Sequence, residues 1–192
     1  MKILIVDNHD SFTYNLLQMV EQIVGKTNVV VAKNDEIALK KIEDFDKIIL
    51  SPGPGIPKEA GLLMEIIQEF STKKPILGVC LGLQAIVEYF GGDLYNLSKI
   101  YHGVGTEISI LQPSATIFTN ISQNPIVGRY HSWAANTKNF PNQLQITSKD
   151  QDGIVMSIQH CCLPIHAVQF HPESILTPQG KQMLENFIFL AE

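Results

Sequence analysis

The sequence contains few cysteines, no long apolar run and no cluster of basic residues. Only three of its 192 residues are cysteines, and two of these, Cys161 and Cys162, are adjacent. Such a set makes a poor disulfide framework, and a reducing compartment explains it more simply. Apolar runs such as 3–6 and 29–32 are far shorter than the roughly 18 residues of a membrane span or the roughly 7 of a signal-peptide core. We therefore expect a cytoplasmic protein that does not cross a membrane.

The charge balance also excludes several functions. The chain has 14 Lys and Arg residues against 19 Asp and Glu residues, a net charge of -5, and no run of Lys or Arg. Binding to a phosphate backbone depends on clustered cations, so we expect no nucleic-acid partner. No phosphate-binding glycine motif and no recognisable metal-ligand spacing of histidines is present, so we expect no cofactor and no metal. The length and the 45% of hydrophobic residues predict one ordered domain over 1–192.

The first half of the chain alternates between two kinds of segment. Aliphatic runs without polar alternation predict buried parallel strands at 2–6, 29–32, 48–50 and 75–79. Apolar residues at helical spacing predict helices at about 12–24, 35–45, 63–70 and 83–90. We expect Asp10 or Ser11 to cap the first helix and Gly25 to end it. This alternation predicts an open, mostly parallel, twisted sheet with flanking helices.

The second half of the chain lacks helical periodicity over most of its length. Shorter β-like pieces occur at 106–111, 116–118, 144–147, 154–159 and 165–170, with turn signals such as Asp152-Gly153 between them. Thr177 and Pro178 form a good N-cap and N1 pair for a last helix that runs to about Leu190. The overall prediction is an α/β fold with a small antiparallel β part in its second half.

One motif points to a nucleophile. Gly78-Val79-Cys80-Leu81-Gly82 has the thiol in the place of serine in the G-x-S-x-G elbow, between a predicted strand and a predicted helix. The elbow strains the backbone of the nucleophile, and the flanking glycines let neighbouring chain approach. A helix N-terminus also favours the thiolate form of a cysteine. The alternative is that Cys80 is a buried apolar filler.

A second motif supplies a base. In His171-Pro172-Glu173, residues i and i+2 of extended chain point the same way, so the carboxylate can reach the imidazole. Glu173 would fix the tautomer of His171, which could take a proton from Cys80 and deliver it to a leaving amine. The alternatives are a solvent-exposed histidine or a metal ligand shared with His166, although His166 has the opposite strand parity.

The segment 51–57 is rich in proline and glycine and follows the third predicted strand. Its three prolines leave few N–H donors, among them that of Gly53. We expect the N–H groups of Gly53 and Leu81 to stabilise an oxyanion, because fixed donors in a partly dry site are worth about 3 kcal/mol each. A tight structural turn is the alternative explanation of this loop.

Taken together, these motifs resemble the class I, or triad-type, glutamine amidotransferases. The likeness covers nearly the whole chain and is carried by the segments 51–55, 78–84 and 169–173. The segment 7–15 further resembles the branch of the family that serves chorismate-using synthases. The resemblance implies a flavodoxin-like fold and a reaction in which Cys80 attacks the amide of L-glutamine, ammonia leaves, and water hydrolyses the glutamyl thioester.

The resemblance also implies partners and binding residues. Ammonia would pass to a chorismate-binding synthase subunit (component I), which we expect to be a separate chain. That subunit would make anthranilate for tryptophan or, alternatively, aminodeoxychorismate for folate. The residues carried over as glutamine-binding are Gly53, Pro54, Gly55, Gln84, Ser132 and Trp133. Two positions depart from the common pattern, since Leu83 stands where a histidine is frequent and Trp133 where a smaller apolar residue is frequent.

Two other functions compete with this one. A catalytically silent regulatory subunit could keep the fold, but it would have no need of Cys80, His171 and Glu173 together. A cysteine hydrolase or peptidase on a related elbow fold is the third candidate, and the proline- and glycine-rich loop disfavours it.

Overall fold

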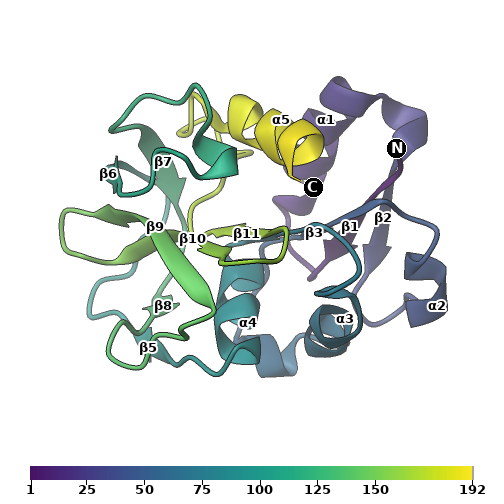
Figure 1. Ribbon diagram of the computed structural model, residues 1–192, viewed down its shortest axis with the longest axis horizontal. Helices are drawn as coiled ribbons and strands as arrows, with labels where there is room; N and C mark the ends of the chain where they lie inside the picture. Colours follow the sequence, from purple (N-terminus) through teal and green to yellow (C-terminus); the bar gives the residue numbers. More distant parts are fainter. Residues whose placement is uncertain (192) are drawn as a thin grey trace.

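A mixed β-sheet runs through the middle of the structure, a computed structural model that describes residues 1–191 (Figure 1). The strands are β1 (Ile3–Asp7), β2 (Val29–Lys33), β3 (Lys47–Leu50), β4 (Ile76–Val79), β5 (Leu94–Asn96), β6 (Val104–Ile110), β7 (Ile126–Arg129), β8 (Trp133–Ala135), β9 (Leu144–Asp150), β10 (Val155–His160) and β11 (Ile165–Val168). The α-helices are α1 (Thr13–Val24), α2 (Leu39–Ile42), α3 (Leu63–Phe70), α4 (Leu81–Tyr89) and α5 (Gly180–Leu190). The 3-10 helices are η1 (Lys26–Asn28), η2 (Pro57–Glu59) and η3 (Thr116–Phe118).

The order of the strands confirms the predicted α/β class. Within residues 1–191 the main sheet has nine strands in the order β2-β1-β3-β4-β11-β10-β9-β6-β7. Neighbours from β2 to β11 pair in parallel, and those from β11 to β7 pair antiparallel. The antiparallel part therefore extends the parallel sheet, while β5 and β8 form a separate two-stranded sheet.

Helices cover both faces of the parallel part. α1 and α5 lie on one face and α3 and α4 on the other (Figure 1). The predicted stripe of α3, made of Leu63, Ile66, Ile67 and Phe70, is buried against the sheet. Burying each of these side chains is worth roughly 1.5–3 kcal/mol, so the stripe fixes the helix on the sheet more strongly than helix propensity does.

Three local predictions were wrong. No side chain caps α1, because the carboxylate of Asp10 accepts from the backbone N–H of Phe12, the residue that precedes the helix. The helix expected at 35–45 is only the four-residue α2, because the preceding residues turn back onto the carbonyl of Lys33. The piece 116–118 is the 3-10 helix η3, which buries Ile117 and Phe118 and bonds to α5 through the side chain of Asn186.

The residues before α5 also differ from the prediction. The helix begins at Gly180, and Thr177 is not its N-cap. Instead, the Thr177 hydroxyl donates to the carbonyl of His171 at 2.6 Å and accepts the N–H of Gly128 at 2.9 Å. A side chain suited to capping thus ties the loop after β11 to strand β7.

The carboxyl ends of the parallel strands gather the candidate residues at one edge of the sheet. β1, β3, β4 and β11 are neighbours, and the chain leaves them at Asn8, Ser51, Cys80 and Gln169. Open parallel sheets hold their sites at this edge. Among the described residues, no helix has the length and apolar character to cross a membrane.

Candidate active site

Cys80 occupies a strained turn between β4 and α4. Its backbone has φ 52° and ψ -98°, a left-handed conformation that costs a residue with a Cβ roughly 1–3 kcal/mol. The turn is held from both sides, since the N–H of Cys80 donates to the carbonyl of Val168 at 2.8 Å and its carbonyl accepts from the N–H of Gln84 at 3.1 Å. The thiol is therefore presented at the N-terminus of α4, as the elbow motif predicts.

The two glycines of the motif are required by close packing. A Cβ on Gly78 would lie 2.6 Å from the carbonyl carbon and oxygen of Gly82, and a Cβ on Gly82 would lie 2.7 Å from the carbonyl oxygen of Leu50. These neighbours are backbone atoms and cannot move independently of β3 and α4. The glycines thus let α4 start directly above the sheet, which sets the height of Cys80 over the strand ends.

His171 and Glu173 form a buried pair. Nδ1 of His171 and Oε1 of Glu173 are 2.8 Å apart, and the two side chains are almost fully buried. Nε2 of His171 is also buried and has no hydrogen-bond partner of standard geometry among residues 1–191. With Nδ1 held by the carboxylate, Nε2 is the nitrogen available for chemistry.

The protonation of His171 is set by opposing effects. Burial by itself lowers the pKa of the imidazole, whereas hydrogen-bonding and charge interactions with Cys80 and Glu173 raise it, to about 10. Cys80 thus acts on the ring although no bond of standard geometry joins its Sγ to Nε2. A raised pKa favours the protonated imidazole, the form that can later transfer a proton to a leaving group.

Aromatic rings and backbone contacts fix the position of His171. The rings of Phe12 and Tyr130 lie edge-to-face against it, with centroids 5.0 and 4.9 Å away. The N–H of His171 donates to the carbonyl of Gly128 at 2.9 Å. The imidazole therefore has little freedom to rotate away from the thiol, and it is shielded from bulk water.

The proline- and glycine-rich loop lies against the start of α4. A Cβ on Gly53 would be 2.5 Å from the Leu81 side chain and 2.7 Å from Cβ of Asn8. The side-chain amide of Asn8 donates to the carbonyl of Ser51 at 2.8 Å, and the hydroxyl of Ser51 accepts the N–H of Asn8 at 2.9 Å. Gly53, in a loop with little freedom, is thus brought against Leu81 at the start of α4, and these two residues are the predicted oxyanion pair.

Gln84 connects the thiol region to the small sheet. Its side-chain amide donates to the carbonyl of Trp133 at 3.2 Å and to Oε1 of Gln169 at 3.3 Å. The amide of Gln169 in turn donates to Sγ of Cys80 at 3.5 Å. Ser132 and Trp133 are half-buried beside this chain of bonds.

The remaining predicted positions are placed as follows. Pro54 and Gly55 are exposed in the loop after β3, and Gly55 has φ +73°. Leu83 is fully buried in the core on the α3 and α4 face of the sheet, so this unusual residue packs inside the protein. No group of three or more His, Cys, Asp or Glu side chains in the described chain is placed to hold a metal ion.

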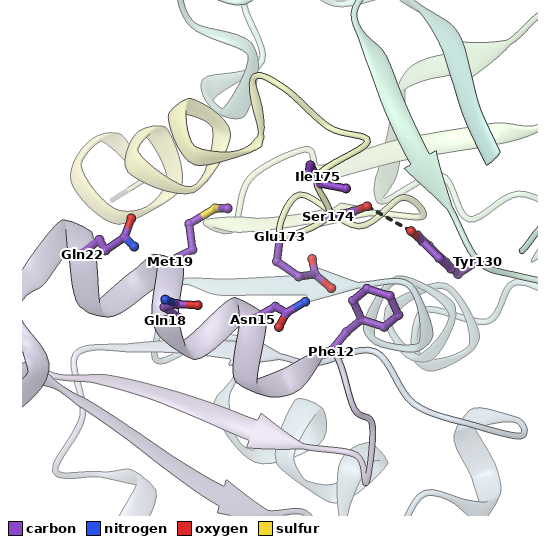
Figure 2. Close-up of a pocket in the computed structure, with 9 residues that line it drawn as sticks. All are labelled: Phe12, Asn15, Gln18, Met19, Gln22, Tyr130, Glu173, Ser174 and Ile175. Carbon is purple, nitrogen blue, oxygen red and sulfur yellow. Dashed lines mark hydrogen bonds between the residues drawn. The ribbon is translucent and has the colours of Figure 1, made fainter. Parts of the chain in front are cut away.

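A pocket of about 340 Å³ lies next to Glu173, between α1 and the loop after β11 (Figure 2). Asn15 and Met19 of α1 line one side, and Tyr130, Ser174 and Ile175 line the other. The hydroxyls of Tyr130 and Ser174 are 3.1 Å apart. Because Cys80 is not among the lining residues, this pocket adjoins the acid end of the pair rather than the thiol.

Comparison with known proteins identifies the family. The family described as "Glutamine amidotransferase class-I" matches residues 4–191, a range that includes Cys80, His171 and Glu173. The chain belongs to the class-I glutamine amidotransferases. This membership agrees with the fold and with the arrangement of the thiol, imidazole and carboxylate.

Relatives of this amidotransferase have informative names. "Aminodeoxychorismate/anthranilate synthase component 2" of Bacillus subtilis is 44% identical over 189 residues, which cover 97% of this chain and 95% of the relative. "Anthranilate synthase component 2" of Pseudomonas aeruginosa is 40% identical over 193 residues, covering 97% and 94%. The "Bifunctional protein TrpGD" of Thermotoga maritima is also 40% identical, but this chain spans only 32% of its length.

A solved structure shares the fold of this amidotransferase. It is that of a Thermoplasma acidophilum protein whose description names it as part of a GMP synthase. The two superpose with a TM-score of 0.87 at 26% sequence identity, over 98% of this chain and 92% of that one. The likeness extends over the parallel and the antiparallel parts of the sheet.

Two residues of the candidate site lie in the segments that carry the family resemblance but were given no role there. Gln169 is fully buried and reaches Cys80, and it stands two residues before His171, so strand parity gives a usable signal. Asn8 anchors the loop that carries Gly53, and its signal is its position directly after β1, at the carboxyl edge of the sheet.

Proposed function

We propose that this chain hydrolyses L-glutamine to glutamate and ammonia with Cys80 as nucleophile, His171 as acid and base, and Glu173 as the group that orients the imidazole. The observation that carries the proposal is the interaction of a strained thiol at a helix N-terminus with a buried imidazole whose Nδ1 is 2.8 Å from a carboxylate. Membership in the class-I glutamine amidotransferases supports the same chemistry.

The reaction follows from these positions. The thiolate of Cys80 attacks the side-chain carbonyl carbon of glutamine and converts its oxygen to an oxyanion. The C–N bond then breaks, and the nitrogen takes the proton of Nε2 of His171 and leaves as ammonia. Neutral His171 next removes a proton from water, whose hydroxide attacks the thioester. Glutamate leaves, and the thiolate and imidazolium are restored. Each step uses groups of this chain, glutamine and water.

The oxyanion needs donors that are in place before the reaction. We assign this role to the N–H groups of Gly53 and Leu81, because the loop and the start of α4 are packed together there. Fixed donors of this kind are each worth about 3 kcal/mol of transition-state stabilisation. We assign the binding of glutamine to residues of the loop after β3, of α4, and of β8 with the residue before it, namely Gly53, Pro54, Gly55, Gln84, Ser132 and Trp133.

We further propose that the ammonia is used by a chorismate-binding synthase subunit that makes anthranilate. The names "component 2" of the relatives from Bacillus subtilis and Pseudomonas aeruginosa support a two-component enzyme. The names also support a second product, aminodeoxychorismate. The name of the Bacillus subtilis relative mentions both aminodeoxychorismate synthase and anthranilate synthase. A relative from Klebsiella aerogenes, at 39% identity, is named "Aminodeoxychorismate synthase component 2". We place the protein in the cytoplasm as one amidotransferase domain.

A thiol substitution tests the glutaminase step. Cys80→Ser in the complex with the synthase subunit is expected to abolish glutamine-dependent product formation and to leave synthesis from added ammonium salt intact. Cys161→Ser is the matched control, because that cysteine is exposed and free. Retention of glutamine-dependent activity by Cys80→Ser, or loss of both activities, would refute the assignment.

A reconstitution distinguishes the two products. The chain is mixed with an anthranilate synthase component I or with an aminodeoxychorismate synthase component I, and glutamine-dependent product is measured with chorismate. Anthranilate formation supports the first assignment. Activity only with the aminodeoxychorismate synthase component would transfer the chain to folate synthesis, and activity with neither would overturn the chorismate assignment.

A further inference from the structure

A buried ion pair lies close to Trp133, the first residue of β8 in the small sheet, and to Ser132 just before it. Nη1 of Arg129, on β7, is 2.6 Å from Oδ2 of Asp150, at the end of β9, and both side chains are almost completely buried. The other oxygen of Asp150 accepts the N–H groups of Asp152 and Ile154, in the turn to β10. The guanidinium also lies over the ring of Tyr101, with Cζ 3.4 Å from the ring centroid. Arg129 is therefore held on several sides.

Arg129 determines the tautomer of His131. Nε of Arg129 donates to Nε2 of His131 at 3.0 Å, and arginine has no acceptor to offer. Nε2 of His131 must therefore be unprotonated, and the proton of the neutral ring is on Nδ1. Nδ1 is 2.8 Å from the carbonyl of Trp133, which can only accept. Burial first, and then the charge of Arg129, lowers the pKa of His131 to about 4, in keeping with a neutral ring.

The bonds continue to the thiol. The carbonyl of Trp133 accepts from Nδ1 of His131 and from the side chain of Gln84. Gln84 also donates to Gln169, and Gln169 donates to Cys80. One chain of hydrogen bonds thus runs from the buried ion pair through the carbonyl of Trp133 to the sulfur.

The small sheet has only a short ladder of its own. β8 pairs only with β5, over three residues of each strand, and neither belongs to the nine-stranded sheet. A two-stranded ladder of this length is at best marginally stable by itself, so the position of Trp133 also depends on the packing of the small sheet against α4 and on side-chain bonds. The side-chain bonds connect this region to β7, β9 and α4, which are parts of the main body.

We propose that His131 and Arg129 are positioning residues for glutamine binding, acting through the Nδ1–H of His131 on the carbonyl of Trp133. The proposal rests on the proposed glutaminase function, in which Ser132, Trp133 and Gln84 bind the substrate. It assigns a role to a histidine that neither titrates during the reaction nor touches the reacting atoms.

Two substitutions of His131 separate its two nitrogens. In His131→Asn the side-chain amide can take the place of Nδ1–H and donate to Trp133, whereas in His131→Gln the amide reaches the place of Nε2 and faces Arg129. We expect His131→Gln to raise the KM for glutamine about five- to tenfold, with little change in kcat. This factor corresponds to the loss of one hydrogen bond, the one to the carbonyl of Trp133. His131→Asn is expected to keep the parental KM.

Alkylation of Cys80 by iodoacetamide supplies an independent readout, because it needs the thiolate but no bound glutamine. Its rate is expected to be the same in both variants and in the parent. Equal KM values in all three proteins would overturn the proposal. So would an equal rise of KM in the two variants, or a slower alkylation that matches the loss of activity, since either would indicate a general structural role.

Arg129→Lys is a second test that keeps the charge opposite Asp150. The ammonium cannot reproduce the Nε donor together with the planar contact on Tyr101. A raised KM for glutamine with unchanged alkylation of Cys80 supports the proposal, and a parental KM contradicts it. Failure of the proposed function itself would be seen differently, as a parent protein that releases no glutamate in the complex.

Discussion

Gly180 offers a sharp test because two physical effects predict opposite outcomes for Gly180→Ala. Gly180 is the first residue of α5, and helix propensity alone predicts that alanine stabilises the protein by up to about 1 kcal/mol. The packing predicts the reverse. A Cβ at this position would lie 1.8 Å from the carbonyl oxygen of Pro172 and 2.6 Å from its carbonyl carbon. Pro172 stands between His171 and Glu173, so relief of the clash has to move this proposed catalytic pair or the helix.

The size of the effect follows from this contact. Carbon and oxygen approach no closer than about 3.3 Å even in weak C–H···O contacts, so the carbonyl or the helix must move by about 1.5 Å. Overpacking of this kind destabilises a protein by typically 1–3 kcal/mol. A displacement of about 1 Å at reacting groups can reduce the rate about 100-fold. We therefore expect lower thermal stability and a kcat for glutamine hydrolysis reduced by about two orders of magnitude.

Thermal unfolding and glutamate release by the complex are the measurements. Gly105→Ala is the matched control, because its Cβ would meet only a side-chain methyl of Ile126 at 3.4 Å. Synthesis from ammonium salt should remain in both variants, since the synthase subunit performs it. A Gly180→Ala protein as stable and as active as the parent would refute the packing argument.

Further predictions concern the imidazole and its supports. Glu173→Gln removes one of the interactions that raise the pKa of His171 to about 10. Because the proposed mechanism needs the imidazolium as acid, the alkaline limit of kcat/KM for glutamine is expected to move to lower pH. Thr177→Val removes two buried hydrogen bonds, to His171 and Gly128, and is expected to cost about 1–3 kcal/mol of unfolding free energy. Gly82→Ala is expected to be as harmful as Gly180→Ala in both assays, because its Cβ would meet backbone of β3.

For each of these predictions, a specific result would contradict the reasoning. An alkaline limit that stays in place in Glu173→Gln would show that the carboxylate does not set the protonation of His171. Thr177→Ser keeps the hydroxyl and should retain most of the stability, so equal losses in the serine and valine variants would contradict the role of the hydrogen bonds. A fully active Gly82→Ala would show that α4 can rise from the sheet without cost.

The parallel part of the fold was predictable because its inner strands β1, β3, β4 and β11 are buried on both faces and even the half-exposed edge strand β2 is aliphatic. The segments 2–6, 29–32, 48–50 and 75–79 are nearly uniform aliphatic runs, and they correspond to β1, β2, β3 and β4. The strands β5, β7 and β8 were not predicted, because they have only three or four residues and gain their stability from partners distant in sequence. The 3-10 helix η3 was mistaken for a strand because three residues carry no periodicity.

The residues of the candidate site likewise fall into two groups, those that the sequence predicts and those that only the structure reveals. Cys80, His171 and Glu173 were predictable because short motifs encode them, and the structure brings them together at the strand ends. The contribution of Arg129 depends on its contacts with Asp150 and Tyr101, which no local pattern reveals. Strand parity relates Gln169 to His171 but does not show the bond of Gln169 to Cys80. Thr177 shows the opposite error, since its local pattern was that of a helix cap while its hydroxyl bonds to strand β7 and to the loop after β11.

The three free cysteines allow the central claim to be tested directly. Cys161 and Cys162 are exposed, whereas Cys80 is buried beside His171. The complex is incubated with a chloroketone analogue of glutamine, and the labelled peptide is identified by mass spectrometry, with and without excess glutamine. We predict a label on Cys80 that glutamine prevents, in spite of the burial of this thiol. A label confined to Cys161 and Cys162, or one on Cys80 that glutamine does not reduce, would contradict the account.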